Sequence, residues 1–169
     1  MKKLMLATII VLLSLPMPAN AILAKYWRLR IQSGSAMETL TYSAGARIAV
    51  RLSPWKMVSG NLSYGTTIVD DMGLTANDPN TLAADAELEG DVVDNTSNLY
   101  WGVKGYFEIT ADVNPTIGTC YLFLEESDDN SNWPSDKADF DCDEDLNLLC
   151  ALTLSTDAED EARGKNFEF

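Results

Sequence analysis

Histidine is absent from all 169 residues of this chain. Its absence excludes Ser-His-Asp triads, Cys-His pairs and the commonest zinc sites, because these sites use an imidazole. Basic residues are scarce, with 12 lysines and arginines against 26 aspartates and glutamates and a formal net charge of −14. So acidic a surface repels phosphates, which argues against nucleic-acid binding. The sequence contains no complete catalytic motif, so we predict that the protein is not an enzyme.

The sequence has one long apolar run, from Leu4 to Leu15 near the N-terminus. Two lysines precede this run and a small-residue segment ending at Ala21 follows it, a pattern typical of a bacterial secretory signal peptide. The run is shorter than the about 20 residues that span a bilayer. We therefore predict a cleaved signal peptide over residues 1–21 and a secreted, periplasmic or extracellular mature chain without a stable membrane span. The alternative is an apolar N-terminal arm or anchor.

Helical periodicity of amphipathic length is also missing from residues 22–169, whereas apolar and polar residues alternate in several short segments. Trp27, Leu29 and Ile31 share one face of such a segment, and residues 47–52 repeat the arrangement. This alternation predicts strands with one buried and one solvated face. Residues 22–169 are thus expected to form a single all-β domain, an antiparallel β-sandwich or jelly-roll-like fold. Further strands are expected near 66–70, 99–109, 119–126, 146–154 and 163–169, and a helical turn near 82–87.

Residues 92–109 read VVDNTSNLYWGVKGYFEI, a polar cluster followed by a long alternating segment. The polar residues 94–98 predict a turn, and the residues after them predict a strand whose buried face begins at Leu99. Residues 119–126 and 146–154 carry apolar side chains on both faces, which is typical of central strands covered on each side. Residues 92–109 are interpreted as packing scaffold.

Three cysteines are present, and in an exported chain this odd number permits one disulfide. Cys120 and Cys150 are the expected pair. Both lie in apolar strand patterns, so the alternative is that they are buried thiols of the core.

Charge is distributed unevenly along the chain. Residues 22–56 carry six basic residues and one acidic residue, whereas residues 57–169 carry four basic and 25 acidic residues. The basic part either neutralises the acidic part within one domain or faces the acidic part of another subunit. In residues 22–56 we expect a basic face that binds an anionic partner, such as lipopolysaccharide or an acidic neighbouring subunit. The alternative is a solvated strand face that balances the acidic loop of the same chain. The residues of this face are Arg28, Arg30, Arg47 and Arg51.

Residues 125–161 are rich in aspartate and glutamate and contain a candidate calcium site. Calcium takes several oxygen ligands from a flexible loop, which this composition can supply. The EF-hand spacing is absent, because Trp133 and Glu144 stand where that motif has its glycine. A solvated acidic loop is the alternative, so we expect no cofactor other than calcium. The candidate ligands are Asp128, Asp139, Asp141, Asp143 and Asp145.

Aromatic residues in the expected strands and loops are candidates for stacking on sugar rings of a surface glycan. Ordinary packing in the sheets is the alternative. The candidates are Tyr100, Tyr106, Tyr121 and Trp133.

Several of these segments resemble small β-sandwich virion proteins of tailed bacteriophages. In that family a DNTSN-x-Y turn, as at residues 94–100, leads into a long strand, and a YLFLEES-D-x-S-N-W strand and turn follows, as at residues 121–133. The resemblance covers about residues 60–155, including YGTTI at residues 64–68 and GYFEI at residues 105–109. It implies a decoration, head-fibre or tail-associated role in the virion, without catalysis.

These observations together predict a non-enzymatic structural or assembly protein. Its expected partners are other protein subunits, in a homo-oligomer or a larger assembly with charge-complementary interfaces. The alternative is an exported carbohydrate-binding or calcium-dependent adhesion module.

Overall fold

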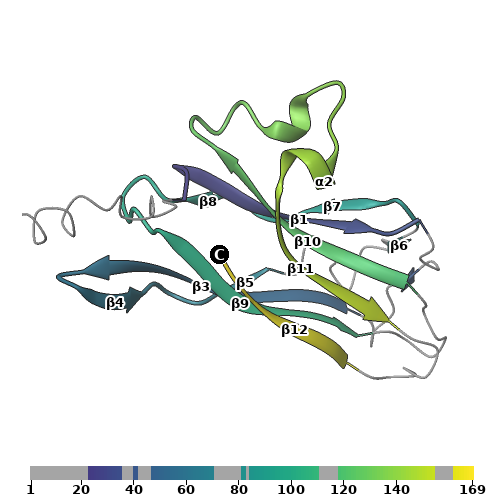
Figure 1. Cartoon of the computed structure of the whole chain (residues 1–169), viewed down its shortest axis with the longest axis horizontal. Coiled ribbons are helices and arrows are strands. Elements are labelled where there is room, and N and C mark those ends of the chain that lie inside the picture. The colour runs from purple at the N-terminus through teal and green to yellow at the C-terminus, as the bar shows by residue number, and fades with distance from the viewer. Residues whose placement is uncertain are drawn as a thin grey trace, which may run out of the picture.

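Two antiparallel β-sheets pack face to face in the computed structural model of the chain (Figure 1). The structure describes residues 23–35, 40–41, 47–70, 81–82, 84–110, 118–154 and 162–169. The predicted all-β sandwich is therefore confirmed. The expected signal peptide, residues 1–21, lies outside the described residues.

The first sheet, called sheet I, has the strand order β11-β10-β1-β7. A further short strand, β8, pairs with β1 beyond the end of β7. Its strands are β1 (Tyr26–Ser33), β7 (Glu87–Glu89), β8 (Val93–Asp94), β10 (Gly118–Ser127) and β11 (Asn147–Leu154).

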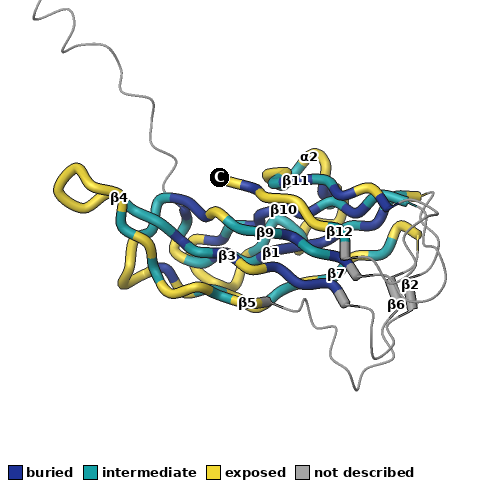
Figure 2. The backbone as a smooth tube through the Cα atoms, turned by 90° about the horizontal axis from the view of Figure 1, so that it is seen from below, coloured by how far each residue is buried: buried dark blue, intermediate teal, exposed yellow. Residues whose placement is uncertain are grey.

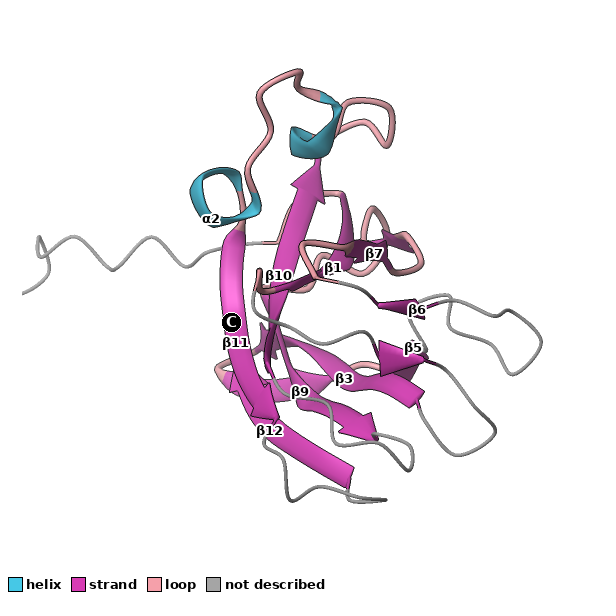
Figure 3. Cartoon of the chain, turned by 90° about the vertical axis from the view of Figure 1, so that its right-hand side faces the viewer, coloured by secondary structure: helices cyan, strands magenta, loops and turns pink. Residues whose placement is uncertain are grey.

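The second sheet, called sheet II, has the order β12-β9-β3-β4, and β5 also pairs with β3. A separate two-stranded pairing joins β2 (Leu40–Thr41) to β6 (Thr81–Leu82). Two short helices, η1 (Pro134–Asp136) and α2 (Cys142–Asp145), lie between β10 and β11 at one end of sheet I (Figure 3). The strands of sheet II are β3 (Arg47–Val58), β4 (Asn61–Tyr64), β5 (Ile68–Asp70), β9 (Gly102–Thr110) and β12 (Ala162–Glu168).

The core lies between the sheets and consists of the apolar residues that alternate along their strands. Trp27, Leu29 and Ile31 of β1 are buried there, as the sequence predicts. Ile48, Val50 and Leu52 of β3 face them from sheet II, so both N-terminal strands confirm the period-two pattern. The buried inner segments contrast with exposed turns at the ends of the sandwich (Figure 2). Burial of these side chains supplies the main favourable contribution to folding.

Residues 94–100 differ in part from the expectation. The turn is confirmed at residues 96–98, but the strand begins at Gly102, not at Leu99. Leu99 is exposed and has a φ of 52°, a left-handed conformation that ends the alternation. Asn95 is buried instead, and its side chain organises the turn.

Two further expectations are corrected. Strand β10 is a central strand, but β11 is the outermost strand of sheet I in the described part of the chain, and its outer face is not covered. Leu148 of β11 accordingly remains 54% exposed. The helical turn expected at 82–87 is wrong, since β6 ends at Leu82, a turn occupies residues 84–85 and β7 begins at Glu87. Among the described residues, no helix is long and apolar enough to cross a membrane.

Candidate functional site

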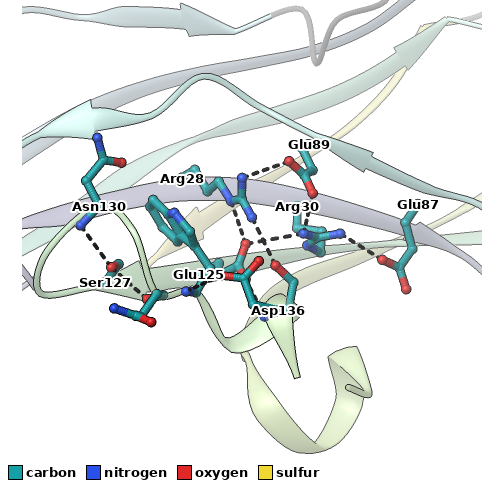
Figure 4. A network of polar contacts seen from close by, with 11 residues as sticks. Arg28, Arg30, Glu87, Glu89, Glu125, Ser127, Asn130 and Asp136 are labelled. Carbon is teal, nitrogen blue, oxygen red and sulfur yellow. Dashed lines mark hydrogen bonds and ion pairs between the residues drawn. The ribbon is translucent and has the colours of Figure 1, made fainter. Parts of the chain in front are cut away.

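Arg28 and Arg30 lie side by side on the outer face of sheet I, because their neighbours in β1 point into the core. The register of β1 with β10 places Glu125 opposite Arg28. Nε of Arg28 donates to Oε2 of Glu125 at 2.6 Å, and Nη2 of Arg30 reaches the same oxygen at 3.5 Å (Figure 4). The Glu125 side chain is fully buried, at 0% exposure.

Strand β7 supplies two more carboxylates to these arginines. Glu89 accepts from Arg28 Nη1 at 2.7 Å and from Arg30 Nη2 at 2.6 Å, while Glu87 accepts from Arg30 Nη1 at 2.8 Å. Burial alone would lower the pKa of Arg30, but the charges of Glu125, Glu89 and Glu87 outweigh it and raise that pKa. Burial alone would raise the pKa of Glu125, but bonds from Arg28 and Ser135 and the charge of Arg30 lower it. Both groups are therefore held in their charged forms.

The acidic segment, residues 128–146, folds back over this ion network. The guanidinium carbon of Arg28 lies 4.3 Å from the ring centroid of Trp133, and that of Arg30 lies 5.2 Å from the ring of Phe140. The backbone N–H of Ser135 donates to Oε1 of Glu125 at 2.9 Å, and its hydroxyl accepts from Arg28. The two arginines thus bind acids and aromatic rings of their own chain.

The four arginines of the expected basic face do not lie together. Arg51 belongs to β3 of sheet II and is exposed on the opposite outer face of the sandwich from Arg28 and Arg30. The side chain of Arg47 lies outside the described part. The sequence predicted one basic face because all four arginines alternate with core residues. That alternation does not specify which of the two sheets a strand belongs to.

Several carboxylates of the acidic segment bind its own backbone. Asp141 accepts from Asp143 N–H at 2.9 Å and caps α2, and Asp145 accepts from Asp141 N–H and pairs with Lys137. The candidate ligands Asp128, Asp139 and Asp143 are exposed. Over the described ranges, no three Asp, Glu or Cys side chains are grouped so that they could hold a metal ion.

The aromatic candidates are also separated. Trp133 covers Arg28 and borders a pocket of about 390 Å³ at the end of β10. The ring of Tyr121 lies 6.4 Å from that of Phe123 on sheet I, and Tyr100 packs against the core. Tyr106 lies on sheet II opposite Arg51. Arg51 and Tyr106 are therefore two sequence-selected residues that the fold brings to one place.

That place is a groove of about 460 Å³ on the outer face of sheet II. The register of β9 with β3 pairs Tyr106 with Arg51 and Lys104 with Ser53. The register of β9 with β12 places Asn166 and Glu168 opposite Tyr106 and Lys104 on the other side. The groove therefore combines two cations, one carboxylate, an aromatic ring and neutral hydrogen-bonding side chains. Its remaining lining residues are Thr67, Gly105 and Phe167.

Two glycines near this groove leave space that neighbouring groups occupy. A Cβ on Gly164 would lie 2.1 Å from the hydroxyl oxygen of Tyr106, so the tyrosine occupies the space above this glycine. A Cβ on Gly105 would lie 2.3 Å from the carbonyl oxygen of Arg51 and 2.8 Å from Phe167 Cζ. Gly105 lets the core ring of Phe167 approach the backbone closely.

The hairpin of β3 and β4 is a second surface feature, and it projects from the end of the sandwich (Figure 2). Ser59 and Gly60 form its tight turn with φ of 51° and 82°, the left-handed pair that a two-residue hairpin requires. Met57 and Leu62 pair across the strands and are 37% and 50% exposed. Tyr64 lies on the same face and is 46% exposed.

No family model, curated protein or solved structure matches this chain. Sequence reasoning missed Lys104, Asn166 and the hairpin. Lys104 carried a usable signal, since it shares its strand face with Tyr106, and residues 57–69 could have been noticed as a stretch without charge.

All three cysteines are buried thiols in the structure. Cys120 pairs across the sheet with Leu152, and Cys150 pairs with Leu122, so the two cysteines occupy diagonal positions on β10 and β11. The sequence left open a Cys120–Cys150 disulfide or two buried thiols, and in the structure both cysteines are buried thiols. Burial raises the pKa of Cys120 and of Cys142 to about 12 and that of Cys150 to about 11.

Proposed function

We propose that this protein is a non-enzymatic structural protein that assembles through contact between copies of the chain. The observation that carries the proposal is the exposed hairpin of β3 and β4. Hydrophobic side chains gathered on a projecting element are costly in water and gain free energy when another surface covers them.

Charge favours a second copy as the partner of this hairpin. The chain carries a net charge of −14, so two copies repel each other over most of their surface. Residues 57–69 contain no charged residue at all. The hairpin is therefore the surface where two identical acidic chains can meet with little repulsion.

The sheet edge supplies the geometry for this contact. Strand β4 is the last strand of sheet II in the described part of the chain, and it carries neither lysine nor proline. Edge strands that lack such protection readily pair with a strand of another chain. We place β4 of one copy antiparallel to β4 of the next, so that sheet II continues across a two-fold axis.

The arginines of β1 do not take part in this contact. Arg28 and Arg30 are already bound to three glutamates of their own chain, so their charge is satisfied without a partner. We therefore propose a largely uncharged interface in place of the charge-complementary interface expected from the sequence. Contact through apolar side chains keeps its strength at high salt, unlike contact between exposed charges.

The proposed place of action is outside the cytoplasm, as a surface-exposed or virion-associated structural subunit. The signal-like pattern of residues 1–21 and the resemblance of residues 60–155 to phage virion proteins support this part of the proposal. N-terminal sequencing of the protein recovered from culture medium, periplasm and purified particles tests it. Recovery in the cytoplasm alone, with residues 1–21 attached, would contradict it.

Analytical ultracentrifugation over a concentration series tests the assembly. The wild-type chain is expected to sediment as a dimer, and Leu62→Lys as a monomer because the charge enters the shared face. Leu148→Lys is the matched control, since Leu148 is equally exposed on the outermost strand of sheet I. A monomeric wild-type chain at every concentration, or equal dissociation by both substitutions, would overturn the proposal.

A further inference from the structure

We propose that the groove on the outer face of sheet II binds a saccharide that carries a carboxylate, such as an oligosaccharide of uronic or sialic acid. The groove has about 460 Å³, within the range of small-ligand sites. It is lined mainly by residues of β3, β9 and β12, and neither Met57 nor Leu62 of the hairpin proposed for assembly is among its lining residues. The inference goes beyond the proposed function and does not depend on it.

Arg51 supplies the anion-binding group. Its side chain is exposed, and within the described residues it has no ion pair and no hydrogen bond to another side chain. This sets it apart from Arg28 and Arg30, whose donors are occupied by glutamates. A planar guanidinium with vacant donors can bind a carboxylate with two parallel hydrogen bonds.

Lys104 adds a second positive charge beside Arg51. The two residues are diagonal neighbours on β9 and β3, because Arg51 pairs with Tyr106 and Lys104 pairs with Ser53. Nζ of Lys104 lies 3.9 Å from the ring centroid of Tyr64, which holds the ammonium at the border of the groove. Glu168 provides one opposing carboxylate, so the net charge of the lining is positive.

Tyr106 and the neutral polar residues favour a saccharide over a simple anion. The half-buried phenol of Tyr106 lies above Gly164 and lines the groove, where it can serve as a platform for a sugar ring. Asn166 and the paired hydroxyls of Ser53 and Thr67, 3.1 Å apart, offer donors and acceptors for sugar hydroxyls. Cations, a ring and amide or hydroxyl groups together match an acidic sugar.

Titration calorimetry with a panel of acidic oligosaccharides tests the proposal: tetragalacturonate, a hyaluronan tetrasaccharide and sialyllactose. Binding of at least one is expected, and its methyl ester, which keeps the rings but loses the charge, should bind about tenfold more weakly. Arg51→Gln should abolish the preference for the acid. Lys25→Gln is the control, because it removes the same charge from an exposed residue outside the groove.

The platform is tested separately. Tyr106→Ala should weaken the acid and the ester alike, by about five- to tenfold. Gly164→Ala should weaken both ligands in the same way, because its methyl group displaces the phenol of Tyr106. Tyr106→Phe should preserve the ring contact. These two variants test the platform even if the Tyr106→Ala chain does not fold.

Three results would overturn the proposal. They are absence of binding across the panel, equal weakening by Lys25→Gln and Arg51→Gln, or hexaglutamate binding as tightly as the acidic saccharide. All measurements are repeated on Leu62→Lys. Retained binding by the Leu62→Lys chain separates this site from the assembly contact. So does loss of binding by an Arg51→Gln chain that still forms the dimer.

Discussion

Nε of Arg28 lies 2.6 Å from Oε2 of Glu125, and the two residues face each other across β1 and β10. The carboxylate is fully buried beneath the acidic segment. A buried charge of this kind is tolerated only while its partners remain, because an uncompensated ion has lost its hydration. Ser135 N–H donates to the same carboxylate at 2.9 Å, and Trp133 covers Arg28, so this ion pair also ties the acidic segment to sheet I.

Replacing Glu125 by glutamine is expected to destabilise the protein. The amide removes the charge that balances Arg28 and Arg30, and the cost should be about 2–4 kcal/mol. Urea unfolding followed by tryptophan fluorescence measures it. Arg51→Gln removes an exposed charge instead and should cost less than about 0.5 kcal/mol. Equal stabilities for the two variants would show that the ion network does not hold the segment.

The neighbouring carboxylates Glu125 and Glu126 should respond to pH with opposite signs. The pKa of Glu125 is lowered, so its stabilising contribution is present above the ordinary value of 4.5 and is lost as pH falls through the lowered pKa. The pKa of Glu126 is raised, chiefly by burial, so its charged form costs stability above that pKa, and the cost disappears as pH falls through it.

Glutamine substitutions at these two positions form a matched pair. At pH 7, Glu125→Gln should be less stable than the wild-type chain, and Glu126→Gln should be equally or more stable, since an amide can still accept from Ala24 N–H. The Glu126→Gln difference should disappear first, as pH falls through the raised pKa of Glu126 toward 4.5, and the Glu125→Gln difference should shrink only below 4.5, as pH falls through the lowered pKa of Glu125. Melting temperatures from pH 3 to 8 check this. A Glu126→Gln chain that melts well below the wild type at pH 7 would contradict it.

Local alternation was sufficient to predict long strands such as β1, β3 and β10, but not the short strands β4, β7 and β8, and not which strands are neighbours. The local alternation of Trp27, Leu29 and Ile31 with polar residues predicts a half-buried strand, and this prediction needs no tertiary information. Pairing of Arg30 with Glu87 and Glu89 depends instead on β7 lying against β1, across almost 60 residues of chain. Nothing local in either segment specifies that register.

The errors have the same origin. Leu99 fits the alternation of the following strand, yet a single left-handed residue takes it out of the sheet. The apolar residues of β10 and β11 are similar in pattern, but only β10 has strands on both sides. In the groove, Tyr106 and Arg51 were found because each alternates with core residues, whereas Asn166 could not be found without the register of β12.

The cysteines should be unreactive in the folded protein. Burial raises the pKa of Cys120 to about 12, and a thiol with so high a pKa forms almost no thiolate at pH 8. Cys142 and Cys150 are also buried with raised pKa values. Thiol titration at pH 8 should detect no rapid reaction in the native chain and three thiols after unfolding. A single thiol after unfolding under non-reducing conditions would instead indicate a disulfide.

A methyl group at Gly105 should be more harmful than one at Gly164. The Cβ of Gly105→Ala would press on the backbone carbonyl of Arg51 and on the buried ring of Phe167, at a cost of about 1–3 kcal/mol. At Gly164 the obstacle is the end of the Tyr106 side chain, which can turn away. Thermal unfolding of both variants should show the larger fall in melting temperature for Gly105→Ala. The reverse order would mean that sheet II adjusts its backbone more easily than its side chains.

Asn95 should be among the polar residues least tolerant of change. Its Nδ2 donates to the carbonyls of Leu23, Ala24 and Tyr100 at 3.2–3.3 Å, and its Oδ1 accepts from Tyr100 N–H at 2.8 Å. This buried amide joins the beginning of the described chain to the turn before β9.

Asn95→Asp keeps the shape of the side chain but replaces its donor with a carboxylate oxygen facing three carbonyl oxygens. Loss of these bonds and burial of a charge should cost about 3 kcal/mol or more at neutral pH. Asn98→Asp makes the same chemical change at an exposed position of the same turn and should cost less than about 0.5 kcal/mol. Because acid protonates the new carboxyl, Asn95→Asp should recover part of its deficit at pH 4 relative to Asn98→Asp. Urea unfolding at both pH values measures this, and a deficit that is small or independent of pH would show that the amide is not required as a donor.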